Sequence, residues 1–256
     1  MIITLPLNTI LLIAVGGCYA GIQNALAGGG SFITFPTLML AGLSPLSANI
    51  SSTIALFPSQ MASGMVGRKH VAGVGNLSFR DLMLISILGG LIGGMLLLST
   101  PARFFEKIVP WLVLFATGIF AWGNFRSRSL TAAQRVSKKT LAITQFFISI
   151  YGGYFGGGIG FLMLAALTVA GQSVKTAAST KNVLAIAMNA SAVALFIFSK
   201  EVNWSAVLAQ TIGGIVGGII GGLLISRVPE KALRLFVVIM GSVLTVWLFF
   251  RTYLQY

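Results

Sequence analysis

The sequence predicts an all-α polytopic membrane protein made of two inverted-topology repeats. Of its 256 residues, 56% are apolar and only 8% are charged, and the mean hydropathy is +0.95, which is too apolar for a soluble domain of ordinary composition. Glycine accounts for 31 residues, an excess that suits helices packed closely in lipid. The strands of a membrane barrel would alternate apolar and polar residues, and the sequence has no such alternation, so the spans are expected to be helices.

The first apolar stretch, residues 9–41, is too long for one straight crossing. As a single helix it would measure roughly 50 Å, against a hydrocarbon core of about 30 Å. We therefore predict a re-entrant, broken helical hairpin with arms at 9–27 and 31–42, because the second arm is too short to span. The break is expected where three residues lack a Cβ atom, at Gly28, Gly29 and Gly30, just before Ser31.

Three transmembrane helices are expected after this hairpin, at 47–66, 81–99 and 104–123. The second of them carries a doubled GxxxG pattern from Gly89 to Gly94, which predicts close packing on another helix. A basic linker at 124–140 follows, with five Lys or Arg residues and no acid.

The pattern then restarts. A second triple glycine, Gly156 to Gly158, lies 128 residues after the first, and Gly94 with Pro101 has counterparts at the same spacing. Such internal duplication is typical of transporters. We expect a first repeat at 1–123, the cytoplasmic linker at 124–140 and a second repeat at 141–256, whose hairpin occupies 141–170.

The basic loops indicate how the repeats are oriented. In the first repeat the basic segments are the loop at Arg68 and the linker, which lie on one side of the membrane. In the second repeat the loop equivalent to that at Arg68, at Lys200, is neutral, and the loop after Pro229 is the basic one. By the positive-inside rule the two repeats are inverted, with both termini outside the cytoplasm.

The two glycine tips are expected to meet near the membrane midplane. Helix ends at that depth expose N–H groups and partial positive charge, and both stabilise an anion. Polar runs that follow each hairpin would add hydrogen-bond donors. The candidate substrate-binding residues are Gly28, Gly29, Gly30, Ser31, Asn49, Ser51, Ser52, Thr53, Gln60, Gly156, Gly157, Gly158, Thr180, Lys181, Asn182 and Asn189.

Some of these residues have a second interpretation. Lys181 lies six residues after Lys175, hence roughly 9 Å deeper along a helix, where a buried ammonium needs a reason. Its side chain could instead snorkel to the cytoplasmic surface, although Thr180 and Asn182 beside it favour a functional role. Gln60 and Asn189 hold near-equivalent positions, and lining the path or packing between helices explains them equally well.

Several functions are disfavoured by what the sequence lacks. The four acids, Asp81, Glu106, Glu201 and Glu230, fall at span ends or in loops, so a carboxylate proton relay is not expected. The single Cys18 and single His70 supply no metal site, and the chain has no P-loop, so neither a cofactor, ATP hydrolysis nor enzymatic activity is expected. Because the Lys and Arg residues lie mainly in short loops, the net charge of +13 indicates membrane topology and not nucleic-acid binding.

Four motifs together resemble the TauE/SafE (TSUP) family of sulfite exporters over essentially the whole chain. They are the glycine tip followed by Phe32-x-x-Phe35-Pro36, the run Ala48-Asn49-x-Ser51-Ser52-Thr53, the second tip Gly156-Gly157-Gly158-Ile159-Gly160, and Thr180-Lys181-Asn182. This resemblance implies a transporter of a small sulfur-containing anion, such as sulfite or an organosulfonate, in a prokaryotic inner membrane. A related family that carries thiosulfate uses cysteines, which the single Cys18 does not match.

Two rival functions stay open. One is a channel or transporter for another small anion or solute, for which changing Lys181 to Met would leave transport largely intact. The other is an intramembrane enzyme, for which the sequence supplies no nucleophile and base at depth. A homodimer, the direction of transport and its coupling to protons are left open by the sequence.

Overall fold

The computed structural model describes residues 5–26, 29–67, 70–125, 137–224 and 230–254. Over these ranges the chain forms ten α-helices and no strand, with a single isolated bridge between Val74 and Leu77 in the loop before the fourth helix. The predicted all-helical class is confirmed. Gly28, Arg68, Lys69, Arg126, Arg128, Arg135, Arg227 and Pro229, and most of the predicted linker 124–140, lie outside the described residues.

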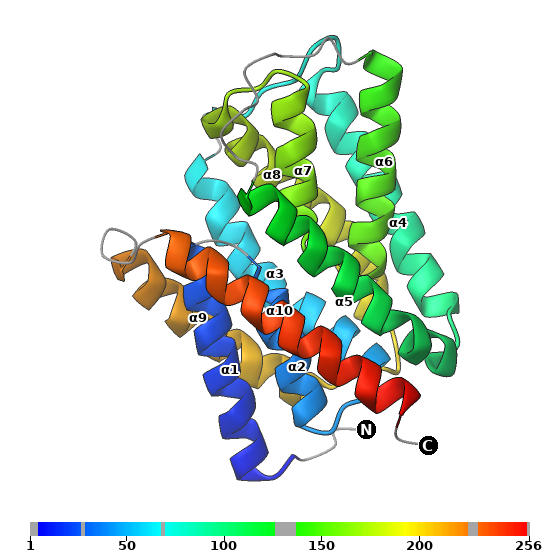
Figure 1. The fold of residues 1–256 in the computed structure, drawn as a ribbon, viewed down its shortest axis with the longest axis vertical. Coiled ribbons are helices and arrows are strands. Elements are labelled where there is room, and N and C mark those ends of the chain that lie inside the picture. Colours follow the sequence, from blue (N-terminus) through cyan, green and yellow to red (C-terminus); the bar gives the residue numbers. More distant parts are fainter. Residues whose placement is uncertain (1–4, 27–28, 68–69, 126–136, 225–229, 255–256) are drawn as a thin grey trace. The chain divides into compact units, whose positions relative to one another are not determined.

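The ten helices follow the predicted order of short and long segments (Figure 1). The first five are α1 (Leu7–Leu26), α2 (Ser31–Leu40), α3 (Pro45–Gly67), α4 (Phe79–Ser99) and α5 (Ala102–Phe125). The second five are α6 (Lys138–Tyr154), α7 (Ile159–Val169), α8 (Val174–Phe196), α9 (Trp204–Leu224) and α10 (Glu230–Tyr253).

The chain divides into two compact units. The first unit is Met1–Ser59, Thr100–Gly118 and Phe196–Tyr256, and the second unit is Gln60–Ser99 and Ile119–Leu195. In the first unit α1 packs along α9, and in the second unit α4 packs along α6. Each unit therefore contains one complete hairpin, α1 with α2 or α6 with α7, whose first arm packs on a long helix from the opposite half of the sequence, α9 or α4.

Glycine faces make the helix contact in the first unit. A Cβ atom added at Gly213 would overlap the carbonyl oxygen of Ala14, and one at Gly217 would overlap that of Cys18. On the other helix, a Cβ at Gly21 would overlap the carbonyl oxygen of Gly214. The backbones of α1 and α9 thus touch, as expected for helices that associate in lipid through small residues.

The second unit repeats this arrangement between α4 and α6. A Cβ at Gly93 would overlap the carbonyl oxygen of Ile150, and one at Gly153 would overlap that of Gly90. The predicted packing role of the doubled GxxxG pattern is confirmed. Gly94 faces a different neighbour, since its added Cβ would lie 3.2 Å from the Leu195 side chain.

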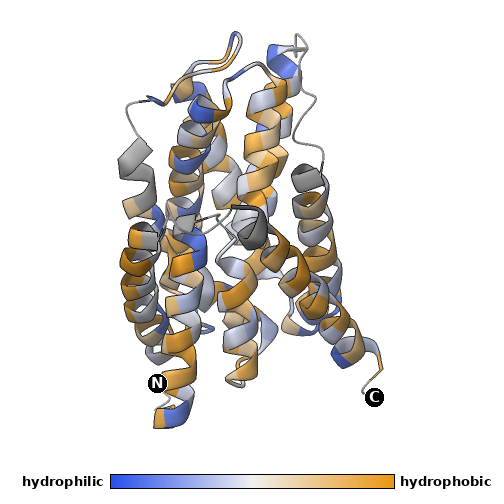
Figure 2. Ribbon diagram, turned by 60° about the vertical axis from the view of Figure 1, so that its left-hand side comes forward, coloured by the Kyte–Doolittle hydropathy of each residue, from blue (hydrophilic) through white to orange (hydrophobic). Residues whose placement is uncertain are grey.

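Large apolar side chains take the opposite faces of these helices. On α9, Gly213, Gly214, Gly217 and Gly221 are buried while branched residues point outward, and along the helices the ribbon is mostly apolar (Figure 2). A water-soluble protein would bury its large apolar residues, so this reversed pattern suits a lipid environment. The exposed large apolar residues on α9 are Trp204, Leu208, Ile212, Ile215, Val216, Ile219, Ile220 and Leu223.

Two of the described helices are long and apolar enough to cross a membrane by length and composition, namely α4 and residues Trp204–Gly221 of α9. The hairpin arms α2 and α7 are apolar but have only 10 and 11 residues. At 1.5 Å per residue each arm is roughly 15 Å long, about half of a hydrocarbon core. The prediction that these arms are too short to span agrees with their lengths.

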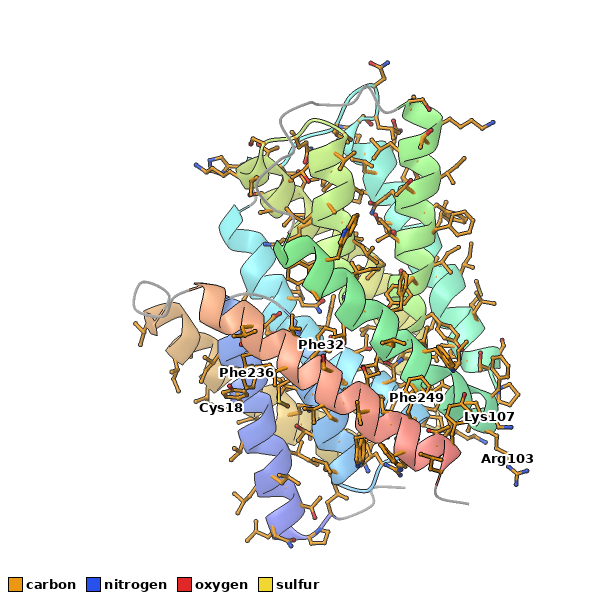
Figure 3. The ribbon with its side chains drawn as sticks, in the orientation of Figure 1. Cys18, Phe32, Arg103, Lys107, Phe236 and Phe249 are labelled. Atoms are coloured by element: carbon orange, nitrogen blue, oxygen red, sulfur yellow. The ribbon has the colours of Figure 1, made fainter. Side chains whose placement is uncertain are left out.

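One end of the first unit carries an aromatic cluster. The Tyr253 hydroxyl on α10 donates to the Lys107 carbonyl oxygen on α5 at 2.8 Å and accepts from the Trp111 indole at 3.2 Å. Arg103, one turn earlier on α5, extends away from the helices (Figure 3). Exposed aromatic and basic residues at helix ends are typical of the boundary between lipid and water.

The glycine contact predicts unequal effects at two neighbouring positions of α9. Gly217→Ala should lower the stability of the protein by about 1–3 kcal/mol, because its methyl group would overlap the Cys18 carbonyl oxygen. Gly218→Ala is the matched control, since nothing lies within 4 Å of the added Cβ. Thermal unfolding in detergent should show a lower Tm for Gly217→Ala alone, and equal Tm values for both variants would contradict the contact.

Candidate functional site

The break between α6 and α7 forms a tip of four residues, Phe155 to Gly158. The N–H groups of Phe155 and Gly156 both donate to the Tyr151 carbonyl oxygen, at 2.9 and 3.3 Å, and this ends α6. Gly156 and Gly158 have φ angles of +79° and +73°, which only glycine adopts at low cost. The predicted break is therefore confirmed at the second triple glycine, and α7 starts directly after it.

Backbone donors gather at this tip without acceptors. The first N–H groups of the hairpin's second arm that find a partner belong to Phe161 and Leu162, which donate to the Gly158 carbonyl oxygen at 3.0 and 3.4 Å. Among the described residues nothing accepts from the consecutive N–H groups of Gly157, Gly158, Ile159 and Gly160, and no side chain caps α7. Successive unpaired N–H groups at a helix start, on residues that alternate between right-handed and left-handed backbone conformations, form a concave site with partial positive charge, and such a site attracts anions.

A cationic side chain lies beside the same amides. A methyl group added at Gly160 would be 3.4 Å from the Nζ atom of Lys181 on α8. Lys181 is partly buried, and within the described ranges it has no acidic partner and donates no hydrogen bond. Two positive groups in a poorly solvated place repel each other, so an anion would offset both charges at once.

The other members of the Thr180–Asn182 run do not share this position. Consecutive residues on a helix point about 100° apart, so the three side chains diverge. The Thr180 hydroxyl is fully buried, accepts from the Ala72 N–H at 3.2 Å and donates to the Ala72 carbonyl at 3.3 Å. Asn182 is partly buried on the same helix, and the structure gives it no contact with the tip.

The loop that holds Thr180 lies between α3 and α4. Val74 and Leu77 in this loop are buried in the hydrophobic core of the second unit, against residues that include Met163 and Leu184. The Gln172 side-chain amide donates to the carbonyl oxygens of Ala72 and Gly73, at 2.8 and 3.0 Å. The loop is thus fixed on the start of α8, next to the lysine that reaches the tip.

The tip of the first hairpin has a similar start of a helix. Gly28 lies outside the described residues, while Gly29 has a φ of +83° and Gly30 precedes α2 without a side-chain cap. Among the described residues nothing accepts from the N–H groups of Gly30 and Ser31. The Thr34 and Ser52 hydroxyl oxygens lie 2.6 Å apart, so Ser52 on α3 is tied to the first turn of α2.

Other candidate residues on α3 form hydrogen bonds within the protein. Ser51 accepts from the Asn203 N–H at 3.1 Å, and the Thr53 hydroxyl donates to the Asn49 carbonyl oxygen at 2.8 Å. Asn49 and Ser51 are both buried. In the first unit the structure therefore brings Ser52 to the tip and uses Ser51 to hold the loop before α9.

Gln60 and Asn189 contact each other directly in the second unit. The Asn189 amide donates to the Gln60 side-chain oxygen at 2.6 Å, and Asn189 is buried. The sequence left lining and packing equally open for these residues. The structure supplies the packing contact.

Three polar side chains that support the tips and the neighbouring loop were not predicted from the sequence. Tyr151 donates to a tip carbonyl, Gln172 fixes the loop, and the buried Gln210 amide on α9 donates to the Thr34 carbonyl oxygen at 3.1 Å. The sequence could have indicated Tyr151, since this residue carries a hydroxyl group and lies a little more than one helical turn before the second triple glycine. Within the described residues no group of three or more His, Cys, Asp or Glu side chains could hold a metal ion.

Comparison with known proteins identifies the family. A family model described as Sulfite exporter TauE/SafE matches residues 12–248. The chain belongs to the sulfite exporter TauE/SafE family. A "Probable membrane transporter protein" of Haemophilus influenzae is 26% identical over 234 residues, covering 90% of each chain. "Probable membrane transporter protein YfcA" of Escherichia coli K12 is 26% identical over 260 residues, covering 100% of this chain and 94% of the relative.

A third relative from Sinorhizobium sp, "Probable membrane transporter protein ORF9", is 27% identical over 215 residues, which is 82% of this chain and 80% of the relative. No solved structure is significantly similar to the chain. The resemblance noted from the motifs is confirmed, and the chain is a membrane transporter of this family.

The left-handed backbone at the second tip predicts a position-specific cost. Gly158→Ala should destabilise the protein by about 1–2 kcal/mol, because an L-residue is strained at a φ of +73°. Gly160→Ala, two residues later inside α7, should leave the stability unchanged, since its methyl group meets only the Lys181 Nζ atom at 3.4 Å. Equal thermal stability of the two variants in detergent would contradict the tip geometry.

Proposed function

We propose that the protein exports a small sulfur-containing anion, such as sulfite or an organosulfonate, by alternating access around its two glycine tips. The observation that carries this proposal is the convergence of unpaired amides and the Lys181 ammonium at the start of α7. The family description, which names sulfite export, supports the same class of substrate.

The chemistry of the tip suits an oxyanion. The sulfonyl and sulfite oxygens are strong acceptors, and several N–H groups can each donate to a different oxygen. A charge-assisted bond from Lys181 would add specificity for negative charge, because an ammonium at this depth is costly without a counter-charge. A neutral solute would leave that cost uncompensated.

Helix lengths support the two-repeat architecture. The first five helices contain 20, 10, 23, 21 and 24 residues, and the second five contain 17, 11, 23, 21 and 24. The helix pairs also correspond. α1 and α6 hold equivalent places in the two halves, as do α4 and α9, and α1 packs on α9 as α6 packs on α4. We propose that 1–123 and 141–256 are the two repeats.

The contact between Gln60 and Asn189 supports a two-fold relation between the repeats. These residues occupy near-equivalent positions of the two repeats, and a residue can touch its own equivalent only beside the axis that relates the repeats. In inverted transporters this axis lies in the membrane plane. The distribution of basic loops supports the inverted arrangement, and with the family match we propose that the linker is cytoplasmic, that both termini face outward, and that the membrane is a prokaryotic inner membrane.

Export of an anion needs no further energy source under this proposal. A membrane potential that is negative inside drives an anion outward by about 2.3 kcal/mol per charge per 100 mV. The proposed function therefore requires neither a nucleotide site nor a carboxylate relay.

Flux measurements test the proposal. Purified protein in liposomes should carry sulfite or sulfonates at a rate that responds to an imposed membrane potential. Lys181→Met should reduce this flux at least ten-fold through loss of the charge at the tip, and Lys181→Arg should retain part of it. Lys175→Met, at an exposed position of the same helix, should leave the flux unchanged.

Two outcomes would oppose the proposal. Absence of any potential-dependent flux of sulfite or sulfonates would reject the substrate class. Full sulfite flux in Lys181→Met would reject the role of the lysine, and flux of another small anion or solute that does not need Lys181 would favour the alternative, a channel or transporter for that solute.

A further inference from the structure

One side chain controls the backbone of the second tip. The Tyr151 hydroxyl on α6 donates to the carbonyl oxygen of Gly157 at 2.9 Å, and the Tyr151 carbonyl oxygen accepts from the N–H groups of Phe155 and Gly156. Its ring, partly buried, packs edge-on against the Phe155 ring with centroids 6.2 Å apart. A single residue thus contacts three consecutive members of the tip.

The hydroxyl contact fixes the direction of a peptide group. In a trans peptide the carbonyl oxygen of one residue and the N–H of the next point in opposite directions. Because the Gly157 carbonyl points at Tyr151, the Gly158 N–H points the other way and joins the unpaired donors at the start of α7.

This peptide group would rotate easily without the contact. It joins two glycines, and glycine accepts positive and negative φ at similar cost, so sterics alone do not select one orientation. Rotation by half a turn would replace the Gly158 N–H at the tip by the Gly157 carbonyl oxygen. An anion would then meet a partial negative charge where it had met a donor.

We propose that Tyr151 is a positioning residue for the anion site, whose hydroxyl locks the Gly157–Gly158 peptide with its N–H toward the substrate. The lock itself is a property of the hairpin, while its effect on the anion rests on the proposed function. The corresponding position of the first half, 128 residues earlier, holds the buried Gln23, whose amide is also a hydrogen-bond donor.

Loss of the lock should weaken binding without slowing the loaded transporter. If the unlocked peptide spends about a tenth of its time in the binding orientation, the apparent affinity falls by the same factor. We therefore expect Tyr151→Phe to raise the KM for sulfite roughly ten-fold, equivalent to about 1.4 kcal/mol, and to retain the maximal rate at saturating sulfite. A merely structural role would lower the amount of active protein and hence the maximal rate, with the KM unchanged.

The experiment has two arms that use the full chain. Hydrogen exchange of the anion-free protein, followed by mass spectrometry, should show faster exchange of the hydrogen-bonded tip amides, those of Phe155, Gly156, Phe161 and Leu162, in Tyr151→Phe than in the wild type. Sulfite flux in liposomes then gives the KM and the maximal rate. Tyr253→Phe is the matched control, because it also deletes a hydroxyl that donates to a backbone carbonyl, that of Lys107 in the first unit, and it should change neither readout at the tip.

Each result decides the proposal. Faster exchange with a raised KM supports it, and faster exchange with an unchanged KM overturns the positioning role. Unchanged exchange overturns the lock. If the wild type carries no sulfite or sulfonate, the proposed function fails, and the exchange arm still decides whether Tyr151 locks the tip.

Discussion

The start of a helix leaves backbone N–H groups without acceptors inside the helix, and this constraint governs both hairpins. Around the second tip the protein satisfies the carbonyl groups, through Tyr151 for Gly157 and through the first turn of α7 for Gly158. It leaves the amides from Gly157 to Gly160 without acceptors. Gly157, Gly158 and Ile159 are buried, and buried donors without acceptors are costly, so their concentration at one point beside Lys181 supports the proposed anion site.

A lipid environment explains how the helices pack. In lipid, apolar side chains gain nothing by leaving the surface, so helices associate through close contact and backbone polarity. Gly213 and Gly217 bring α9 onto α1, and Gly93 and Gly153 bring α4 onto α6, while leucine and isoleucine face outward. These contacts give each hairpin a rigid support, which a precise arrangement of backbone donors requires.

The parts of the structure that depend on local composition could be predicted from the sequence. The breaks at Gly29 and Gly156, the short arms α2 and α7, and the glycine faces follow from backbone freedom and side-chain size alone. Side-chain partners could not be predicted, because they depend on which segments meet in space. Thr180 and Lys181 are adjacent in sequence, yet one binds the loop at Ala72 and the other reaches Gly160. Nothing in the linear order of the chain indicated that this loop covers α8, or that Tyr151 holds Gly157.

The pairing of α1 with α9 has a consequence for synthesis. The partner of α4 follows it closely, because α6 ends at Tyr154, whereas the partner of α1, α9, begins only at Trp204. The glycine face of α1 must therefore wait in the membrane without its partner while most of the protein is made. The second unit can close first, and the last helices then complete the first unit, so assembly runs from the middle of the sequence toward its two ends.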